Sequence, residues 1–304
     1  GKLSLGISVD YTLQAIKSAK TVIAEVNPNM PVTGPGSLIP VEDVDYFVPA
    51  DIPLISQDPP VIGEVEKTIG QNIAELIKDG DCLQLGIGAV PDAILSFLRD
   101  KKDLGIHSEM ISDGVMELVK CGVINCSRKN YYLGKIVIAF AMGTSEFYKW
   151  LDHNPMIEAL PVSITNIPFN ISQNDNMVAI NSALSVDLLG QVAADTLPGI
   201  QFSGVGGQVD FVRGATDSKG GRAIIALPST AAKGSVSRIV ASLDRGQAVT
   251  TSRYDVDYVV TEYGVAHLKW KTNRDRAKAL ISIAAPEFRE TLKNEYNQLY
   301  GEIL

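Results

Sequence analysis

The sequence predicts an α/β fold, with a mostly parallel, open sheet and helices on both of its faces. Short and almost wholly apolar runs, such as 136–141 and 222–227, are typical of parallel strands covered on both sides. These runs alternate with segments in which apolar residues recur at helical spacing. Several runs end in glycine or polar residues, and ligands bind at this carboxyl edge of an open α/β sheet.

Composition excludes several classes of protein. The chain has 304 residues, of which 45% are apolar and 20% are charged, so it can bury one large core or two. A net charge of −8 and the lack of a Lys/Arg cluster argue against a sequence-independent nucleic-acid binder. No apolar run approaches the ~18 to 20 residues of a membrane-spanning helix, and the first residues do not resemble a signal peptide. We therefore expect a cytoplasmic protein with neither nucleic acid nor a membrane as partner.

The cysteines and histidines do not indicate a metal site. Cys82, Cys121 and Cys126 cannot all pair with one another, and their spacing with the three histidines matches no zinc pattern. We expect reduced thiols and no bound metal.

The first part of the chain combines a helix with two short strands. Leu13 and Ile16 face one side of an expected helix at 10–19, which leads into a short buried strand at 21–26. A second candidate strand is 46–48.

Consecutive prolines then mark a domain boundary. Asp58 precedes Pro59 and Pro60, which can neither continue a helix nor donate to a strand ladder. We therefore divide the chain into residues 1–57 and 58–304.

Beyond this boundary the elements alternate more regularly. An amphipathic helix is expected at 64–78, a strand at 82–85, and a helix that begins near Pro91, a residue suited to the first helical position. The further elements expected are helix 113–119, strand 136–141, helix 147–151, strands 178–183, 222–227 and 258–261, and helices 274–283 and 286–304.

A Gly-x-Gly turn, from Gly86 to Gly88, joins the strand at 82–85 to the following helix. Free amides in such a turn can bind an anion. The turn is a poor dinucleotide fingerprint, because Pro91 takes the place of a third glycine and no acid follows at the expected distance. A plain tight turn is the alternative interpretation.

Glu109 is a candidate nucleophile or base. It stands between Ser108 and Met110 just after a glycine-bearing bend, and a carboxylate among small and apolar neighbours is poorly solvated. The alternative is an ordinary surface or helix N-terminal glutamate whose charge the helix dipole stabilises.

Polar and glycine-rich positions also follow the later strands. Asn181 interrupts an apolar run, so it either braces the structure or donates to a ligand. Three glycines within 204–207 let the backbone come very close to another group. Lys233, Arg238 and Glu262 lie beyond the strands that precede them.

Five stretches together make the sequence resemble the acetyl-CoA hydrolase/transferase family over essentially all of its length. Within the family it is most similar to the members that transfer CoA to or from 4-hydroxybutyrate and butyrate. The five stretches are GIGAVPDA (86–93), LGIHSEMISDG (104–114), INS (180–182), GVGGQVDF (204–211) and VTEYGVA (260–266).

The resemblance implies a class I CoA-transferase-like fold of two similar α/β domains. Residues 1–57 match the end of the first domain and 58–304 match the second, catalytic domain, so we expect most of the first domain to be absent from this chain. We also expect a homo-oligomer. Two residues depart from the family: Trp270 stands where glycine is usual, and Ala285 where a histidine commonly precedes a proline.

The resemblance also implies a mechanism, in which a glutamate attacks an acyl-CoA thioester. An acyl-glutamyl anhydride forms, then an enzyme-CoA thioester, which the acceptor carboxylate resolves. Glu109 matches this glutamate, and the candidate substrates are 4-hydroxybutyryl-, butyryl- or acetyl-CoA with a carboxylate such as acetate. No cofactor is implied, because CoA enters as a substrate. The expected oxyanion and CoA-binding residues are Gly86, Gly88, Asn181, Gly204, Gly206, Gly207, Glu262 and Lys233, with Arg238 as a second candidate for the CoA phosphates.

Three other functions compete with CoA transfer. Acyl-CoA hydrolysis would follow if water resolved the intermediate. A nucleotide-binding dehydrogenase would use the Gly86–Gly88 turn for a nicotinamide cofactor. A non-catalytic module would bind CoA without exchanging it.

Overall fold

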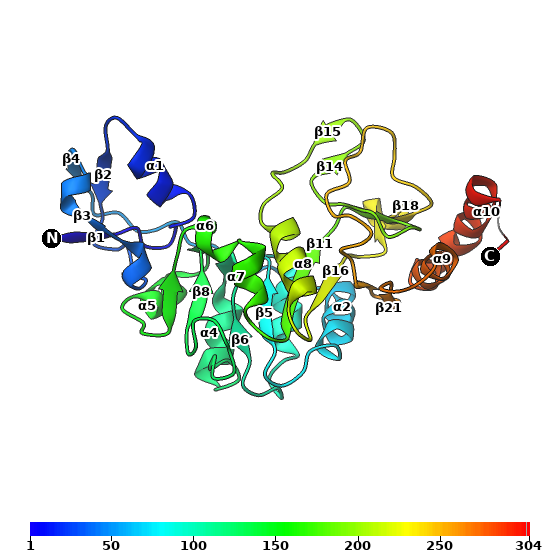
Figure 1. Cartoon of the computed structure of the whole chain (residues 1–304), viewed down its shortest axis with the longest axis horizontal. Coiled ribbons are helices and arrows are strands. Elements are labelled where there is room, and N and C mark those ends of the chain that lie inside the picture. The colour runs from blue at the N-terminus through cyan, green and yellow to red at the C-terminus, as the bar shows by residue number, and fades with distance from the viewer. Residues whose placement is uncertain (302) are drawn as a thin grey trace.

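A six-stranded sheet forms the centre of the molecule. The computed structural model describes residues 1–301 and 303–304. The strands lie in the order β21-β20-β16-β11-β5-β6, and all neighbouring pairs are parallel except β20 with β21. Their bounds are β5 Cys82–Leu85, β6 Gly105–Ile106, β11 Met177–Ser182, β16 Arg222–Ala226, β20 Tyr258–Thr261 and β21 Gly264–His267. The predicted mostly parallel sheet is confirmed (Figure 1).

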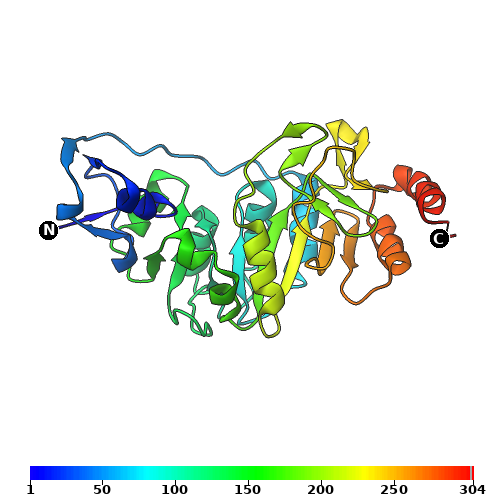
Figure 2. The ribbon, with the colours of Figure 1, turned by 45° about the horizontal axis from the view of Figure 1, so that its top comes forward.

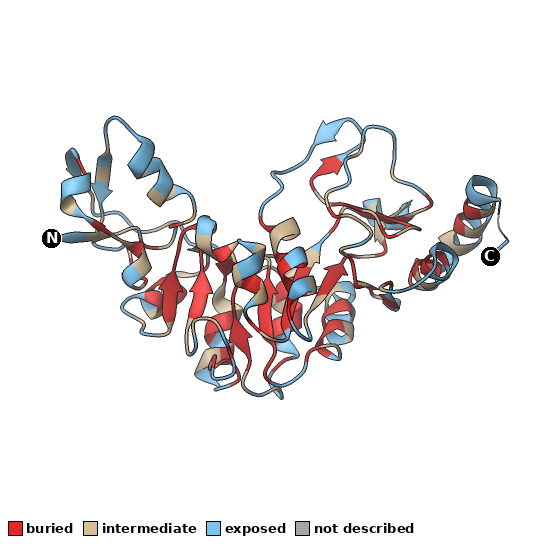
Figure 3. Ribbon diagram, in the orientation of Figure 1, coloured by how far each residue is buried: buried red, intermediate tan, exposed pale blue. Residues whose placement is uncertain are grey.

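Helices cover both faces of this sheet, as predicted. In β11, Val178 and Ile180 belong to the core cluster that contains residues of α2 and α3. Met177 and Ala179, which point the other way, pack in a cluster with Phe211 of α8. The helices are α1 Thr12–Ser18, α2 Glu64–Ala74, α3 Ala89–Ser96, α4 Asp113–Lys120, α5 Ser145–Leu151, α6 Val162–Thr165, α7 Pro168–Ser172, α8 Gln208–Asp217, α9 Asn273–Ser282 and α10 Arg289–Tyr300. Figure 3 shows the strands buried between these layers.

Two small parallel ladders extend the fold beside β6. Strand β8, Ile136–Ile138, pairs with β10, Ile157–Ala159, whereas β9, Phe140–Ala141, pairs with β7, Met110–Ile111. The prediction of one continuous strand at 136–141 is therefore wrong. The ladder changes partner at Ala139, because the N–H of this residue donates to the carbonyl oxygen of Glu109 at 2.8 Å.

The first 50 residues lie at one end of the molecule, far from α9 and α10 (Figures 1 and 2). Strand β2, Ile23–Val26, pairs in parallel with β4, Tyr46–Pro49. The prediction that 21–26 is buried is wrong, since Ile23 is 65% exposed and Val26 is 38% exposed. The pair has no third strand among the described residues. Helix α1 likewise buries none of its residues fully.

Three predicted helix boundaries also differ from the structure. The helix expected over 64–78 ends at Ala74, because the next backbone bonds, such as Ile77 N–H to Ala74 O, have three-residue spacing. Helix α3 begins at Ala89, two residues before Pro91, and Gly88 O accepts from Asp92 N–H. The helix expected over 286–304 is a 3₁₀ turn, Pro286–Phe288, followed by α10, and residue 302 of that range lies outside the described residues.

The remaining strands are short and form two- or three-stranded pieces. They are β1 Lys2–Ser4 with β3 Leu38–Pro40, β12 Ser185–Asp187 with β13 Val192–Ala193 and β19 Ile239–Val240, β14 Thr196–Leu197 with β15 Ile200–Gln201, and β17 Thr230–Ala231 with β18 Val236–Ser237. No helix within the described residues is long and apolar enough to cross a membrane.

Candidate active site

Backbone hydrogen bonds from two ladders fix the position of Glu109. Its carbonyl oxygen accepts the N–H groups of Ala139 at 2.8 Å and Phe140 at 2.9 Å. The hydroxyl of the preceding Ser108 donates to Leu85 O at 3.0 Å, at the last residue of β5. Glu109 is half-buried. The predicted nucleophile therefore stands at the carboxyl end of the central sheet, where ligands bind in α/β folds.

One side chain that the sequence did not indicate contacts this carboxylate. Asn166, between α6 and α7, donates from Nδ2 to Glu109 Oε2 at 2.7 Å. The hydroxyl of Thr165 donates to Asn166 Oδ1 at 2.9 Å. Because an ionised carboxylate can only accept hydrogen bonds, the NH₂ end of the amide faces Glu109 and its oxygen faces the Thr165 hydroxyl.

Gly207 lies directly against the same two groups. A Cβ at Gly207 would be 2.1 Å from Glu109 Oε2 and 2.6 Å from Asn166 Nδ2, so only glycine fits without displacing them. Gly207 is the N-cap of α8, and the exposed Gly206 precedes it. The three glycines within 204–207 and the predicted nucleophile Glu109, both noted in the sequence, thus lie together in the structure.

Three of the other predicted site residues line one cavity of about 430 Å³. Gly86, Asn181 and Gly204 contribute to its wall, together with Phe202 and Val205. Since Val205 is separated from Gly207 only by Gly206, this loop connects the cavity with the Glu109 carboxylate.

Asn181 has the bracing role that is one of the two interpretations left open by the sequence, whereas donation to a ligand stays a prediction. It lines the cavity, and it is also braced by Gln84, a buried residue of β5 that sequence reasoning missed. Asn181 Nδ2 donates to Gln84 Oε1 at 2.9 Å, and Gln84 Nε2 donates back to Asn181 Oδ1 at 3.3 Å. The side chain is thus held in place at the cavity wall.

Arg238 brings a positive charge to this cavity. Burial lowers the pKa of Arg238, and the carboxylate of Glu262 opposes that shift. Glu262 itself is not among the cavity residues. Its two oxygens accept from the backbone N–H of Ser229 at 2.8 Å and from the Ser229 hydroxyl at 2.6 Å.

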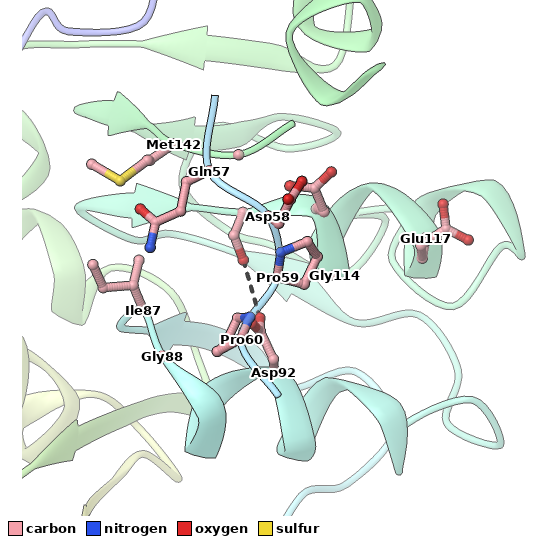
Figure 4. Close-up of a pocket in the computed structure, with 13 residues that line it drawn as sticks. Gln57, Asp58, Pro59, Pro60, Ile87, Gly88, Asp92, Gly114, Glu117 and Met142 are labelled. Atoms are coloured by element: carbon pink, nitrogen blue, oxygen red, sulfur yellow. Dashed lines mark hydrogen bonds between the residues drawn. The ribbon is translucent and has the colours of Figure 1, made fainter. Parts of the chain in front are cut away.

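Like Glu262, the predicted site residues Lys233 and Gly88 lie outside this cavity. Lys233 is exposed on a turn in which Ala232, Lys233 and Gly234 all have positive φ. Gly88 lines a different cavity of about 280 Å³, shown in Figure 4.

The second cavity is acidic and lies beyond the Ile87–Gly88 turn. Residues 57–60 cross it, and Met142 borders it (Figure 4). Its carboxylates are those of Asp58, Asp92, Asp113 and Glu117, and its described lining contains no Lys or Arg. Burial raises the pKa of Asp92, and the charge of Asp113 adds to this effect. Phosphate groups are disfavoured here, so Gly88 does not share the environment of Gly86.

His107 is a structural residue rather than a titrating one. Its Nε2–H donates to Thr165 O at 2.8 Å, and Asn174 Nδ2 donates to its Nδ1 at 3.2 Å. Burial lowers the pKa of His107 to about 3, and the positive charge of Lys129 adds to the shift. The ring is neutral at physiological pH. Elsewhere in the described residues, no group of three or more His, Cys, Asp or Glu side chains is placed to hold a metal ion.

Comparison with known proteins agrees with this architecture. Residues 143–296 match the family model "Acetyl-CoA hydrolase/transferase C-terminal domain". The chain is also 61% identical, over 99% of its length, to 4-hydroxybutyrate coenzyme A transferase from Clostridium kluyveri, and it covers 70% of that protein. The chain belongs to the acetyl-CoA hydrolase/transferase family.

Other members of the acetyl-CoA hydrolase/transferase family are similar in sequence or structure. Butyryl-CoA:acetate CoA-transferase from Anaerostipes caccae is 39% identical over 96% of the chain, which covers 68% of that protein. The crystal structure of 4-hydroxybutyrate CoA-transferase from Porphyromonas gingivalis superposes with a TM-score of 0.88 at 46% identity, over 99% of this chain and 72% of that one. These likenesses confirm the predicted fold and family.

Proposed function

We propose that this protein transfers CoA between a short-chain acyl-CoA and a carboxylate, with Glu109 as the nucleophile. The observation that carries the proposal is the contact of the Glu109 carboxylate with Asn166 and Gly207 at the carboxyl end of the sheet. A loop joins this point to a cavity with both polar and apolar walls. The names of the similar proteins suggest 4-hydroxybutyryl-, butyryl- or acetyl-CoA as donor and acetate as acceptor.

In the proposed reaction a Glu109 oxygen attacks the thioester carbonyl and releases CoA thiolate, leaving an acyl-glutamyl anhydride. The thiolate then attacks the glutamyl carbonyl carbon and releases the first acid, so that CoA is bound to Glu109 as a thioester. The acceptor carboxylate reverses these two steps. The carboxylate supplies the covalent chemistry and CoA is a substrate, so we propose no cofactor.

Each of these steps passes through a tetrahedral oxyanion that needs neutral hydrogen-bond donors. We assign this role to the backbone amides of Gly204, Gly206 and Gly207 and to those near Gly86. Asn181 would bind the acyl group or the pantetheine amides of CoA. Removing one such donor generally costs about 3 kcal/mol of transition-state stabilisation.

The phosphates of CoA require cations near the cavity mouth. Arg238 lines the cavity, and Lys233 is exposed on the turn between β17 and β18. We assign both to phosphate binding. Glu262 would act indirectly, since it holds Ser229 and attracts Arg238.

The test is a panel of carboxylates assayed as CoA acceptors from acetyl-CoA, followed by trapping. Borohydride reduces a thioester but not a free carboxylate, so treatment after incubation with acyl-CoA should inactivate the enzyme at residue 109. Glu109→Ala should abolish transfer, beyond the ~10²- to 10⁴-fold loss from removing a general acid or base. Glu109→Asp should lose about 10²-fold or more, because a shift of ~1 Å breaks near-attack geometry.

The comparator is Glu262→Ala. If this variant lost more activity than Glu109→Ala, and no reduced peptide contained residue 109, the nucleophile would be another carboxylate. Release of free acid without any acceptor would favour acyl-CoA hydrolysis, and CoA binding without exchange would favour a non-catalytic module. Nicotinamide-cofactor binding by calorimetry would favour the dehydrogenase.

We also propose that the protein acts in the cytoplasm as a homo-oligomer that includes a further α/β domain. The exposed β2–β4 pair supports this, because parallel strands are normally covered on both faces. Light scattering that showed a fully active monomer of this chain would contradict it.

A further inference from the structure

We propose that the adjacent residues Thr250 and Thr251 are positioning residues, which anchor both ends of the glycine-rich loop 204–207 beside Glu109. This inference rests on the proposed function and extends it. The proposed function assigns oxyanion binding to the backbone amides of this loop but does not say what holds them in place. Neither threonine is among the described residues that line the cavity, so both would act through the loop.

The glycine-rich loop has little support of its own. Gly204, Val205 and Gly206 are exposed, and their N–H groups donate to no acceptor in the part of the chain that the structure describes. Free donors of this kind are what a developing oxyanion requires. Because these groups make no bonds that could hold the loop, its position depends on the residues at its two ends.

Asp195 holds the start of the loop, and Thr250 holds Asp195. The carbonyl oxygen of Asp195 accepts the N–H groups of Phe202 at 2.8 Å and Ser203 at 3.2 Å. The Thr250 hydroxyl donates to Asp195 Oδ1 and accepts the N–H of Ala194 at 2.8 Å. This hydroxyl thus fixes the residue to which the beginning of the loop is bound.

Thr251 holds the other end of the loop through Gln208, the first residue of α8. Gln208 Nε2 donates to the Thr251 hydroxyl oxygen at 3.1 Å, and Thr251 is fully buried. Gln208 directly follows Gly207, where an added Cβ would lie only 2.1 Å from Glu109 Oε2. The hydrogen bond to Thr251 therefore controls how closely the loop approaches the nucleophile.

The two threonines are themselves held by one buried strand. The N–H groups of Thr250 and Thr251 both donate to Val192 O, at 2.8 Å and 3.2 Å, and Val192 N–H donates to Thr251 O at 3.1 Å. Val192 is fully buried in β13. Both ends of the loop are thus tied to the same rigid point, so its amides are in place before a substrate binds. Oxyanion donors are effective because they are preorganised in this way.

The experiment compares Thr251→Val and Thr251→Ser with Thr33→Val in the complete protein. Valine keeps the branched shape of threonine and removes its hydroxyl, whereas serine keeps the hydroxyl. Thr33 is a matched control, because it is also fully buried and its hydroxyl donates to Gly6 O at 2.6 Å, within the first 50 residues. The readouts are kcat and KM for CoA transfer, the melting temperature, and the rate at which a CoA adduct appears on the residue-109 peptide after mixing with acyl-CoA.

Thr251→Val should lower kcat by about 10- to 10²-fold, because a displacement of ~1 Å at the reacting groups costs about 10²-fold. Adduct formation should slow by a similar factor, while KM changes far less. The melting temperature should fall no further than in Thr33→Val, which should keep wild-type kinetics. Thr251→Ser should restore kcat. Thr250→Val and Thr250→Ser should reproduce this loss and rescue at the other end of the loop.

A double-mutant cycle tests the bond between Gln208 and Thr251 itself. Gln208→Met removes the donor and keeps the length of the side chain. If the two residues act through one bond, the double variant Gln208→Met/Thr251→Val should be no slower than the slower single variant.

Wild-type kcat in either of the folded variants Thr250→Val and Thr251→Val would overturn the inference. Losses that multiply in the double variant would also overturn it, because Gln208 would then act on the substrate directly from the cavity wall. An equal loss of activity in Thr33→Val would do the same, since the effect would be one of packing. Failure of the proposed function looks different, because the wild-type protein would itself form no adduct at Glu109.

Discussion

A single methyl group added at Gly207 should lower the rate of CoA transfer while leaving the fold intact. The Cβ of Gly207→Ala would lie 2.1 Å from Glu109 Oε2, whereas a close carbon–oxygen contact is about 3.3 Å. The carboxylate would have to move by about 1 Å, and a displacement of this size costs about 10²-fold in rate. The backbone at Gly207 has φ −89° and ψ 3°, which alanine can adopt, so the fold should persist.

The assay is CoA transfer from acetyl-CoA, combined with thermal unfolding of the same preparations. Gly63→Ala is the matched control, because it also places a Cβ at a helix N-cap close to a carboxylate oxygen, here Glu66 Oε2 at 2.6 Å. The Glu66 side chain can move away, and no function depends on it. Transfer within a few-fold of wild type in folded Gly207→Ala would refute the close packing of Gly207 on the nucleophile.

Two further predictions concern stability. Trp270 is 91% exposed and has φ +63°, so Trp270→Gly should raise the free energy of unfolding by up to about 1 kcal/mol, while Lys271→Gly, at ordinary φ, should lower it in urea titrations. His107 has a pKa of about 3 when folded and ~6.5 when unfolded, so the unfolded state binds more protons between these values. The free energy of unfolding should therefore fall by about 1.4 kcal/mol for each pH unit of acidification below pH ~6.5. His107→Gln should remove this part of the slope; an unchanged slope would contradict the buried, neutral ring.

The sequence predicted Glu109 and the glycines at 204–207 as site residues, but it did not predict Asn166, which contacts both. Glu109 stands out as a carboxylate among small and apolar neighbours, and 204–207 stands out because three of its four residues are glycine. Asn166 does not, because it lies between two very short helices where no periodic pattern exists, and its partner is far away in sequence. The prolines at 161 and 168, which enclose this segment, were the signal that could have drawn attention to it.

Burial was harder to predict than secondary structure. The apolar run in β2 is typical of a covered strand, yet covering depends on elements that the run itself does not specify. Likewise, Leu76 and Ile77 continue the helical spacing of α2, although the helix ends at Ala74. Ile77 lies in the turn after the helix and is still buried there, so its apolar side chain made the predicted helix too long. At Trp270, in contrast, a feature of the sequence matches the structure. Trp270 stands where the family usually has glycine, and its backbone is left-handed, a conformation that favours glycine.

The double hydrogen bond to the Glu109 carbonyl has a consequence for how specificity can diverge. Since hydrogen bonds to Leu85 on one side and from residues 139–140 on the other hold Ser108 and Glu109, an insertion or deletion between β6 and β7 would displace the nucleophile. The cavity rim is built differently, from exposed loop residues such as Phe202 and Val205. Mutations there leave the ladders intact. Substitutions in the cavity rim can thus admit other carboxylic acids as substrates while the Glu109 carboxylate keeps its position.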